Sequence, residues 1–375
     1  PEERYLEKSE RLINVEWNLN SDGTYLITGI GTCTDLKVYI PDTYEGKPVI
    51  SIGDRAFYDS PILALVLGDN VERIEDWAFG CADKMTYFII SEDSNLKFID
   101  KYAFYECVSL LSFTLPETIE TISDAAFFEC YKLLVVYNRS SIALNLGKSD
   151  SHYLAYYAKE IINDGTISLN MGVEGDYVYY QNGTTTYLVA YLGNSTILQL
   201  PEMLNNSQYH IYKYGLSNIN ITNLVFSKGV IGIEDYAFEN SRVNLAAISV
   251  ASDNTVFKSD MNCLIKISNN ALILGCNNSL IPSYVTRIED DAFNGCNLIE
   301  SVTIPNTITY LGYGAFENCE NLKYVTFAEG INLKVIKSGT FKACKMLVEI
   351  SIPDSVEEIG GSAFYDCDAL EKVKF

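Results

Sequence analysis

The amino-acid sequence predicts an α/β repeat fold that is mostly β: a right-handed solenoid of short strands and short helical turns, with inserted β-hairpins. A small residue followed by a large apolar one recurs every 22–25 residues over most of the chain. Each recurrence follows a short apolar alternation that a Pro or a small residue ends. Apolar residues make up 48% of the 375 residues, enough for one continuous core built from stacked repeats.

The recurring pair is the clearest sign of the repeat. It occurs in nine copies, with Gly215-Leu216 as a weaker member. The nine are Ala56-Phe57, Ala78-Phe79, Ala103-Phe104, Ala126-Phe127, Ala237-Phe238, Ala292-Phe293, Ala315-Phe316, Thr340-Phe341 and Ala363-Phe364. Because one short repeat cannot bury its apolar face alone, the period predicts coils that stack and share an interior.

Each repeat has the same internal order. In one copy, alternating apolar residues at 110–115 predict a strand, and Pro116 ends it because proline cannot donate to a β-ladder. A second apolar step at residues 119–122 precedes the pair Ala126-Phe127. The phenylalanine is expected to fill the interior from the opposite wall, within a short helical turn.

The period divides the chain into four segments. Residues 1–20 are expected to form a helical or capping extension, and residues 21–139 a first array with an opening hairpin. Residues 140–209 break the period, are rich in tyrosine, and end in a stretch that resembles the start of the first array. Residues 210–375 are expected to form a second array, interrupted by an inserted hairpin at 256–280.

The inserted hairpin contains two cysteines outside the repeat position. Apolar runs at 263–267 and 272–276 flank Asn269-Asn270, a pair that tolerates positive φ in a tight turn. A two-residue turn there sets Cys263 opposite Cys276, near disulfide reach. Two interpretations stay open: a disulfide that staples the hairpin, or two buried thiols.

The charge balance excludes some partners. The chain has 27 basic and 49 acidic residues and a formal charge of −22, with no basic cluster. Such a surface repels phosphate backbones and anionic lipids, so neither nucleic acid nor a membrane is an expected partner. No apolar run reaches the roughly 18–20 residues that span a bilayer. The chain starts at Pro1, and we expect that a leader peptide has been removed.

Catalytic and metal-binding patterns are not found. Seven of the ten cysteines are expected to form one column of small buried side chains: Cys81, Cys107, Cys130, Cys296, Cys319, Cys344 and Cys367. Their spacing follows the repeat rather than a ligand pattern, and His152 and His210 lie near no nucleophile motif. Oxygen-rich stretches at 91–95 and 252–254 are interpreted as Asx-type turns rather than calcium loops. We therefore expect no catalytic residue, no metal site and no cofactor.

The repeat resembles a known family. Val302-Thr303-Ile304-Pro305, followed by Ala315-Phe316 and Cys319, is similar to the units of BspA-type leucine-rich-repeat proteins, and the period lies in the leucine-rich-repeat range. Residues 20–25 and 46–49 resemble the opening module of that family. The resemblance implies a secreted or surface-attached bacterial protein, with adhesion as an expected role. It carries over no catalytic residue and no ligand.

The open face of the predicted sheet is the expected contact surface. Between the inward positions it should present apolar and aromatic side chains, which suit protein interfaces and sugar stacking. The residues expected to contact a partner are Val66, Tyr87, Ile89, Val135, Tyr137 and Tyr324. The alternative is that the tyrosine-rich insertion or the N-terminal helix packs on this face and covers it.

Three functions are compatible with these features. The first is an extracellular or cell-surface module that binds a protein or a glycan by its solenoid surface. The second is a structural spacer without a ligand of its own. The third, a carbohydrate-active enzyme with a site in the irregular middle, needs two facing carboxylates in a cleft. The oligomeric state and the identity of the ligand are left open by the sequence.

Overall fold

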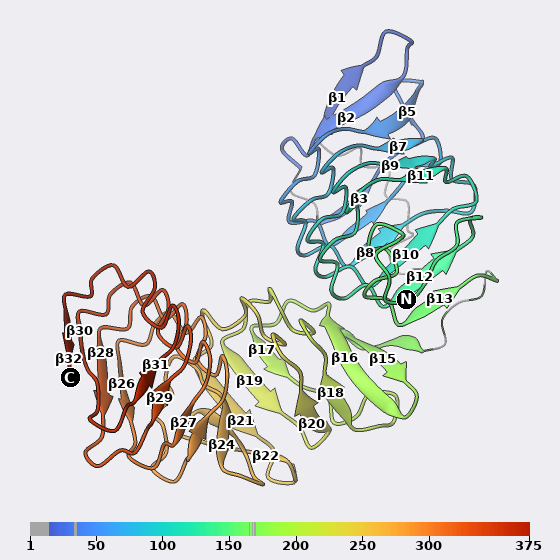
Figure 1. Cartoon of the computed structure of the whole chain (residues 1–375). Helices are drawn as coiled ribbons and strands as arrows, with labels where there is room; N and C mark the ends of the chain where they lie inside the picture. The colour runs from blue at the N-terminus through green and yellow to red at the C-terminus, as the bar shows by residue number, and fades with distance from the viewer. Residues whose placement is uncertain (1–14, 34–35, 165, 167, 169) are drawn as a thin grey trace. The chain divides into compact units, whose positions relative to one another are not determined.

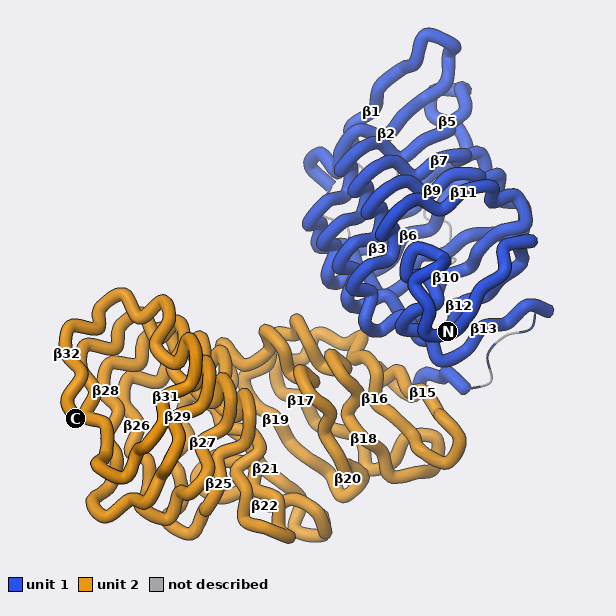
Figure 2. The backbone as a smooth tube through the Cα atoms, in the orientation of Figure 1, with its two compact units in different colours: residues 1–173 blue, residues 174–375 orange. Residues whose placement is uncertain are grey.

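The computed structural model describes residues 15–33, 36–164, 166, 168 and 170–375, and divides the chain into two compact units. Unit 1 comprises residues 1–173 and unit 2 comprises residues 174–375 (Figure 2). Each unit is a stack of short coils whose strands pair mainly in parallel with the next coil (Figure 1). The predicted mostly-β solenoid is therefore confirmed.

Two sheets run along unit 1. One contains β1 (Glu16–Leu19), β2 (Tyr25–Gly29), β5 (Lys47–Ile52), β7 (Arg73–Ile74), β9 (Phe98–Ile99) and β11 (Thr121–Ile122), with β4 (Thr43–Tyr44) paired to β5. The other contains β3 (Lys37–Tyr39), β6 (Ala64–Val66), β8 (Tyr87–Ile89), β10 (Ser112–Leu115), β12 (Val135–Asn138) and β13 (Glu160–Ile162). Residues 160–162 of the irregular segment thus add a strand to the first array.

The coils of unit 1 stack in register. One row begins at Lys37 and continues through Ala64, Tyr87, Ser112 and Val135 to Glu160. Because side chains alternate along a strand, the neighbouring positions point into the interior and place one apolar side chain over the next. The register therefore converts a sequence period into a continuous core.

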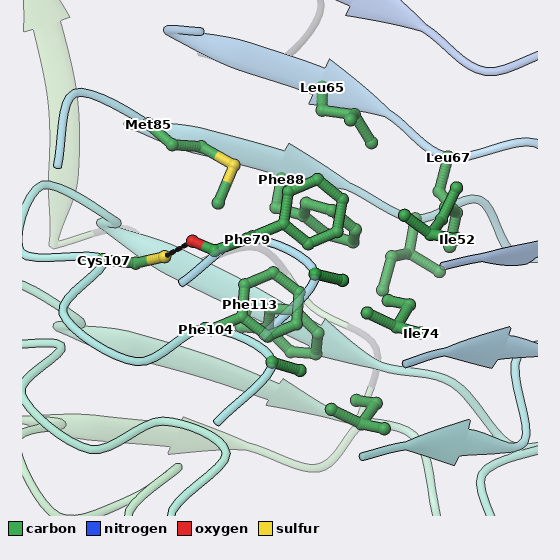
Figure 3. Packing of buried hydrophobic residues seen from close by; sticks show 14 of the residues in the cluster. Ile52, Leu65, Leu67, Ile74, Phe79, Met85, Phe88, Phe104, Cys107 and Phe113 are labelled. Atoms are coloured by element: carbon green, nitrogen blue, oxygen red, sulfur yellow. Dashed lines mark hydrogen bonds between the residues drawn. The ribbon is translucent and has the colours of Figure 1, made fainter. Parts of the chain in front are cut away.

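The recurring phenylalanines form a stack inside each unit. In unit 1 the rings of Phe57, Phe79, Phe104 and Phe127 follow one another at centroid distances of 5.2, 5.2 and 5.0 Å, nearly parallel. Strand phenylalanines such as Phe113 contact this stack edge-on from the other wall (Figure 3). In unit 2 the rings of Phe293, Phe316, Phe341 and Phe364 repeat the arrangement at 4.8, 5.6 and 5.7 Å.

The predicted helical turns are wrong, because the described residues contain no α-helix. The residue before each Ala-Phe pair and the second residue after it have positive φ, as at Trp77 (58°) and Cys81 (59°). A left-handed residue at both ends of a four-residue step prevents the continuous right-handed conformation of a helix. The N–H of the phenylalanine instead donates to the next coil: Phe79 N to Ala103 O is 2.8 Å. The turn wall, by which we mean these stacked Ala-Phe segments, is a ladder between coils.

The strands of unit 2 form several shorter sheets, and β14 (Met171–Glu174) contains the boundary between the units. β14 pairs with β15 (Tyr177–Asn182), followed by β16 (Thr185–Tyr191), β18 (Tyr209–Ile211) and β20 (Val230–Ile233). A second sheet contains β17 (Ile197–Gln199), β19 (Asn223–Phe226) and β21 (Ala247–Val250), and a third contains β22 (Phe257–Asp260), β23 (Cys263–Lys266), β24 (Ala271–Leu274), β25 (Arg287–Ile288) and β27 (Tyr310–Leu311). The last two contain β26 (Ser301–Ile304), β28 (Tyr324–Phe327), β30 (Glu349–Ser351) and β32 (Lys372–Lys374), and β29 (Val335–Ile336) with β31 (Glu358–Ile359).

Antiparallel pairs open both arrays. β1 pairs with β2 in unit 1, and β15 pairs with β16 in unit 2. Residues 16–19 of the predicted helical extension are therefore a strand, while residues 1–14 lie outside the described residues. An antiparallel ribbon at the start of an array gives the first parallel coil a strand to pair with.

The insertion at 256–280 forms three antiparallel strands, β22, β23 and β24. Lys266 pairs with Ala271, so the connection is a four-residue loop rather than a two-residue turn at Asn269-Asn270. A register shift follows, and Leu264 pairs with Leu274. Cys263 is therefore one position out of line with Cys276.

Candidate interaction surfaces

The expected contact residues of unit 1 are mostly not accessible. Tyr87, Ile89 and Val135 are buried, with exposed fractions of 2%, 7% and 0%. Val66 and Tyr137 are partly buried. The open face of these strands is therefore not a free surface in this structure, which corrects the expectation for the three buried residues.

Part of the irregular segment lies against this face. The backbone N–H of Ser168 donates to Tyr137 Oη at 3.4 Å, and the Ser168 hydroxyl donates to Glu160 Oε2 at 2.7 Å. Residues 1–14, the other segment considered as a cover, lie outside the described residues. At Tyr137 this contact favours the covered alternative over a free contact face.

The open sheet of unit 2 is accessible. Tyr324 on β28 is 57% exposed and lies in one row with Ser301, Glu349 and Lys372, all exposed. Lys374 Nζ contacts Glu349 Oε2 at 2.9 Å, so the row mixes one aromatic ring with paired charges. Of the six expected contact residues, Tyr324 is the one that a partner reaches most easily.

A second surface of unit 1 carries a continuous set of aromatic side chains, which we call the aromatic ridge. Its members lie on the turn wall, beside the Ala-Phe pairs or in the turn at residues 151–156: Tyr58, Trp77, Tyr102, Tyr105, Phe128, Tyr153 and Tyr156. Tyr58 and Tyr156 are each 43% exposed, and the others are partly exposed. The ridge therefore presents ring faces and edges to solvent along several coils.

The rings of the aromatic ridge support one another. Trp77 stacks on Tyr102 at 4.7 Å, and Tyr105 stacks on Phe128 at 5.9 Å. Phe128 then meets Tyr153 edge-on at 4.8 Å, and Tyr153 meets Tyr156 at 5.4 Å. Rings held by their neighbours lose little further entropy when a partner binds.

Carboxylates lie among the rings of the ridge. A hydrogen bond to Glu106 raises the pKa of Tyr105 to about 12, so this phenol stays neutral. Glu106 Oε2 also accepts from the Cys81 thiol at 3.6 Å. The ridge was not predicted from the sequence, because the repeat pattern placed the expected contacts on the strand face alone. The signal was present, since aromatic residues flank several of the Ala-Phe pairs of the first array.

The cysteine column has a structural role that the sequence did not reveal. Each thiol in it donates to the backbone carbonyl of a residue in the preceding coil, as in Cys130 Sγ to Phe104 O at 3.1 Å and Cys319 Sγ to Phe293 O at 3.2 Å. Cys81 does not belong to the column: it lies one position earlier, has positive φ, and leaves the buried slot to Ala82. The expected set of seven is thus corrected to six.

Burial makes the column thiols unreactive. Desolvation raises the pKa of Cys130 well above its ordinary value and that of Cys296 to about 12. A thiol is a nucleophile and a metal ligand only as the thiolate, which these sites disfavour. Within the described residues no group of His, Cys, Asp and Glu is placed to hold a metal ion.

The hairpin cysteines are both free thiols in this structure. Cys263 Sγ donates to Leu280 O at 3.3 Å, and Cys276 Sγ donates to Asn262 O at 3.5 Å. Burial raises the pKa of Cys263 to about 12. The shifted register described above explains why the two sulfur atoms bond elsewhere instead of to each other.

The two histidines take part in ordinary contacts. His152 Nδ1 lies 3.4 Å from Asp124 Oδ1, and the His210 ring lies 5.8 Å from the ring of Tyr187. None of the described segments forms a helix long and apolar enough to cross a membrane.

Comparison with known proteins identifies the repeat. The family model described as "BspA type Leucine rich repeat region" matches six copies, at residues 37–145, 194–277 and 265–375, which together span most of the chain. A search of the curated proteins found no match.

Solved structures of similar proteins include a leucine-rich cell surface protein from Faecalibacterium prausnitzii A2-165, with 23% identity over 96% of this chain and 93% of that chain and a TM-score of 0.39. The pneumococcal vaccine antigen PcpA shares 15% identity over 96% and 79%, with a TM-score of 0.41. A leucine-rich repeat protein from Bacteroides ovatus ATCC 8483 shares 20% identity over 97% and 93%, with a TM-score of 0.32. Because these TM-scores are below 0.5, the assignment rests on the matched repeats, and by them the chain belongs to the BspA-type leucine-rich-repeat family.

Proposed function

We propose that this chain is an extracellular or cell-surface interaction module of a bacterium, which binds a protein or a glycan through the outside of its solenoid. The aromatic ridge is the observation that carries the proposal. Contiguous aromatic surface left in water is costly, and it marks contact sites more often than solvated scaffold. Membership in a repeat family supports it, since stacked coils offer a long surface to a partner.

The chemistry of the ridge suits either class of ligand. A sugar ring stacks on Trp77 or Tyr102, with its hydroxyl groups donating to neighbouring carboxylates such as Glu106. A protein partner fills the same surface with apolar or cationic side chains, as the chain itself does where Arg55 lies over the ring of Trp77 at 5.9 Å. The exposed row around Tyr324 in unit 2 is a second, more polar contact surface.

A structural spacer is the second candidate. It is favoured by the burial of Tyr87, Ile89 and Val135, because a sheet face covered by the chain's own residues is not offered to a partner. The two functions differ in one measurable respect: a spacer has no ligand whose binding depends on ridge residues.

The test is binding of the full chain to arrays of extracellular-matrix proteins and glycans. The ridge variant Trp77→Ala/Tyr102→Ala should lose at least about tenfold in affinity for the bound probe, and Tyr324→Ala tests the open sheet. Tyr365→Ala is the matched control: Tyr365 is 65% exposed and follows Phe364 as Tyr58 follows Phe57, but it contacts no other ring among the described residues. Thermal unfolding of each variant separates lost binding from lost folding.

Equal binding by parent and ridge variant would remove the ridge from the proposal. Absence of any bound probe, with the chain folded, would favour the spacer.

A further inference from the structure

The turn wall of unit 2 lacks one turn at the inserted hairpin. In the intact coils that follow, the phenylalanine N–H donates to the next coil, as in Phe293 N to Ala315 O at 2.8 Å. Before Phe293 this role falls to Gly275, whose N–H donates to Ala292 O at 2.8 Å. The carbonyl of Gly275 also accepts from Cys296 Sγ at 3.7 Å, as a phenylalanine carbonyl does elsewhere. Gly275 therefore occupies the phenylalanine position of a coil that has no Ala-Phe turn of its own.

Gly275 lies too close to the ring of Phe293 to carry a side chain. A Cβ atom added there would lie 2.0 Å from Cε1 of Phe293. The residues just before Gly275 belong to β24, where Leu274 pairs with Leu264 of the hairpin. This coil therefore pairs with the hairpin through Leu274 and packs against Phe293 through Gly275. It forms no Ala-Phe turn of its own, so the turn wall is interrupted just before residue 289.

The gap leaves backbone donors without acceptors. In the preceding coil Leu216 N donates to Ala237 O at 2.8 Å and Asn218 N donates to Glu239 O at 2.9 Å. The equivalent N–H groups one coil later belong to Tyr236, Phe238 and Asn240, and none of the three makes a hydrogen bond within the described part of the chain. Phe238 is buried, so its N–H lacks the usual access to bulk water. An unpaired buried donor is costly, and it marks a place where an acceptor is missing.

A cavity of about 480 Å³ lies at this gap, and we call it the notch. Asp235, Tyr236 and Phe238 line it from one coil, and Asp290, Asp291 and Tyr313 line it from the coils that follow. Ile273 and Leu274 of the hairpin line it as well. Its volume falls in the range of small-ligand sites, about 300–1,000 Å³. Tyr236 and Tyr313 are 46% and 50% exposed, and Lys213 and Lys337 lie over their rings at 5.4 and 4.3 Å.

Arg242 donates hydrogen bonds to backbone carbonyls on one wall of the notch. This buried guanidinium donates through Nη1 to Asp291 O at 2.5 Å and to Ala292 O at 3.3 Å. Arg242 interacts electrostatically with Glu239 and Asp291. Burial raises the pKa of both carboxyl groups, and the positive charge of Arg242 offsets part of that rise. Glu234, Asp235 and Asp290 also line the notch, and Lys213 and Lys337 lie over the rings of Tyr236 and Tyr313 beside it, so acidic side chains still outnumber the basic ones around the notch. The notch therefore combines unpaired backbone donors with an excess of negative charge.

We propose that the notch binds a short extended peptide segment that carries a basic side chain. The peptide carbonyls accept from the N–H groups of Tyr236 and Phe238 in the place of the missing coil, as an added strand does at a sheet edge. The ammonium or guanidinium group of the peptide lies near Asp235 and Asp291, whose carboxylates accept its hydrogen bonds. This site is separate from the aromatic ridge of unit 1 and does not depend on it.

The test is titration of the full chain with acetyl-Ala-Ala-Lys-Ala-Ala-amide, followed by calorimetry and by hydrogen exchange of the Phe238 amide. The lysine peptide should bind at least about tenfold more tightly than the same peptide with norleucine, and it should slow exchange at Phe238. Asp235→Asn/Asp291→Asn should weaken the lysine peptide at least about tenfold. The matched control Asp76→Asn/Asp124→Asn removes two charges from a turn wall without a gap and should leave binding unchanged.

A variant in which a larger side chain fills the notch gives an independent check of the binding site. Ile273→Trp adds bulk without changing charge and should abolish peptide binding while ridge-dependent binding persists; if this variant does not fold, the charge variants decide. Equal affinity for the lysine and norleucine peptides would overturn the proposal. So would unchanged binding in Asp235→Asn/Asp291→Asn, or binding of N-acetylchitobiose with no binding of either peptide.

Discussion

The thiol of Cys107 donates a hydrogen bond to the backbone carbonyl of Phe79, 3.1 Å away in the preceding coil (Figure 3). The same bond recurs along the column, and Ser241 makes it with its hydroxyl, to Leu216 O at 2.7 Å. The position takes a small residue, and Cys or Ser there adds a donor for the carbonyl of the preceding coil, whereas Ala82 fills it without one. Ser60 belongs to the first of these coils, and its buried hydroxyl has no partner among the described residues.

The column therefore predicts that replacement by Ala lowers stability at Cys107 but not at Ser60. Cys107→Ala should lower the free energy of unfolding by about 1 kcal/mol, because the Phe79 carbonyl loses its donor, whereas Cys107→Ser should cost less. Ser60→Ala should leave stability unchanged or raise it, because it removes a buried group that bonds to nothing. Both tryptophans, Trp17 and Trp77, lie in unit 1, so urea unfolding followed by tryptophan fluorescence measures the relevant unit. Equal losses in Cys107→Ala and Ser60→Ala would contradict the assignment.

The phenylalanine stack predicts that removing one of its rings lowers the free energy of unfolding strongly, because a large cavity is left in the core. Phe127 is fully buried, 5.0 Å from the ring of Phe104 and 4.8 Å from that of Phe113. Phe127→Ala should lower the free energy of unfolding of unit 1 by about 3–5 kcal/mol. The neighbouring Phe128 is the control, because it is partly exposed on the ridge and its replacement by Ala should cost clearly less. A similar loss for both would argue against the stacked core.

Lys132 predicts a pH-dependent stability. Its side chain is buried, and desolvation lowers the pKa of its ammonium group to about 7. Between about pH 7 and the ordinary lysine pKa near 10.4, the unfolded chain binds a proton that the folded chain does not. The contribution of Lys132 to the free energy of unfolding therefore rises with pH across that window. Below the window, the folded protein carries the full free-energy cost of burying a charged ammonium group.

Lys132→Met keeps the size of the side chain and removes this cost. The variant should be more stable than the parent at pH 7, and the difference should shrink as the pH approaches 10. The difference between the two proteins is the quantity to measure, since cysteines and tyrosines with raised pKa, such as Cys296, destabilise both proteins above pH 9. A stability difference that stays constant from pH 7 to pH 10 would rule out an uncharged buried lysine.

The hairpin register predicts that Cys263 and Cys276 stay reduced. Alkylation of the unreduced, denatured protein followed by peptide mass spectrometry should find both residues modified. In the folded protein the same reaction should be slow, because burial raises the pKa of both thiols. A linked peptide pair, lighter by two hydrogens, would restore the disulfide interpretation.

Much of the fold follows from the sequence because its cause is local and repeated. The spacing of Ala-Phe pairs sets the coil length, and the stacks from Phe57 to Phe127 and from Phe293 to Phe364 form as that spacing predicts. The conformation of the turn wall was predicted wrongly because a four-residue segment with a large apolar residue also fits a helical turn. Inter-coil hydrogen bonds, which no single repeat contains, select the alternation of right- and left-handed residues instead.

The candidate sites were less predictable, for a different physical reason. Tyr87 is buried and Tyr324 is 57% exposed, although the two have the same place in the repeat, so the repeat pattern does not determine which of them a partner can reach. The notch depends on a missing neighbour: Phe238 looks like every other Ala-Phe copy until the hairpin removes the turn to which its N–H would donate. The sequence by itself determined a stacked-coil solenoid with an aromatic core, because apolar periodicity acts within and between adjacent repeats. The tertiary structure alone decided which surfaces are free and which donors lack partners, because burial and pairing depend on residues far apart along the chain.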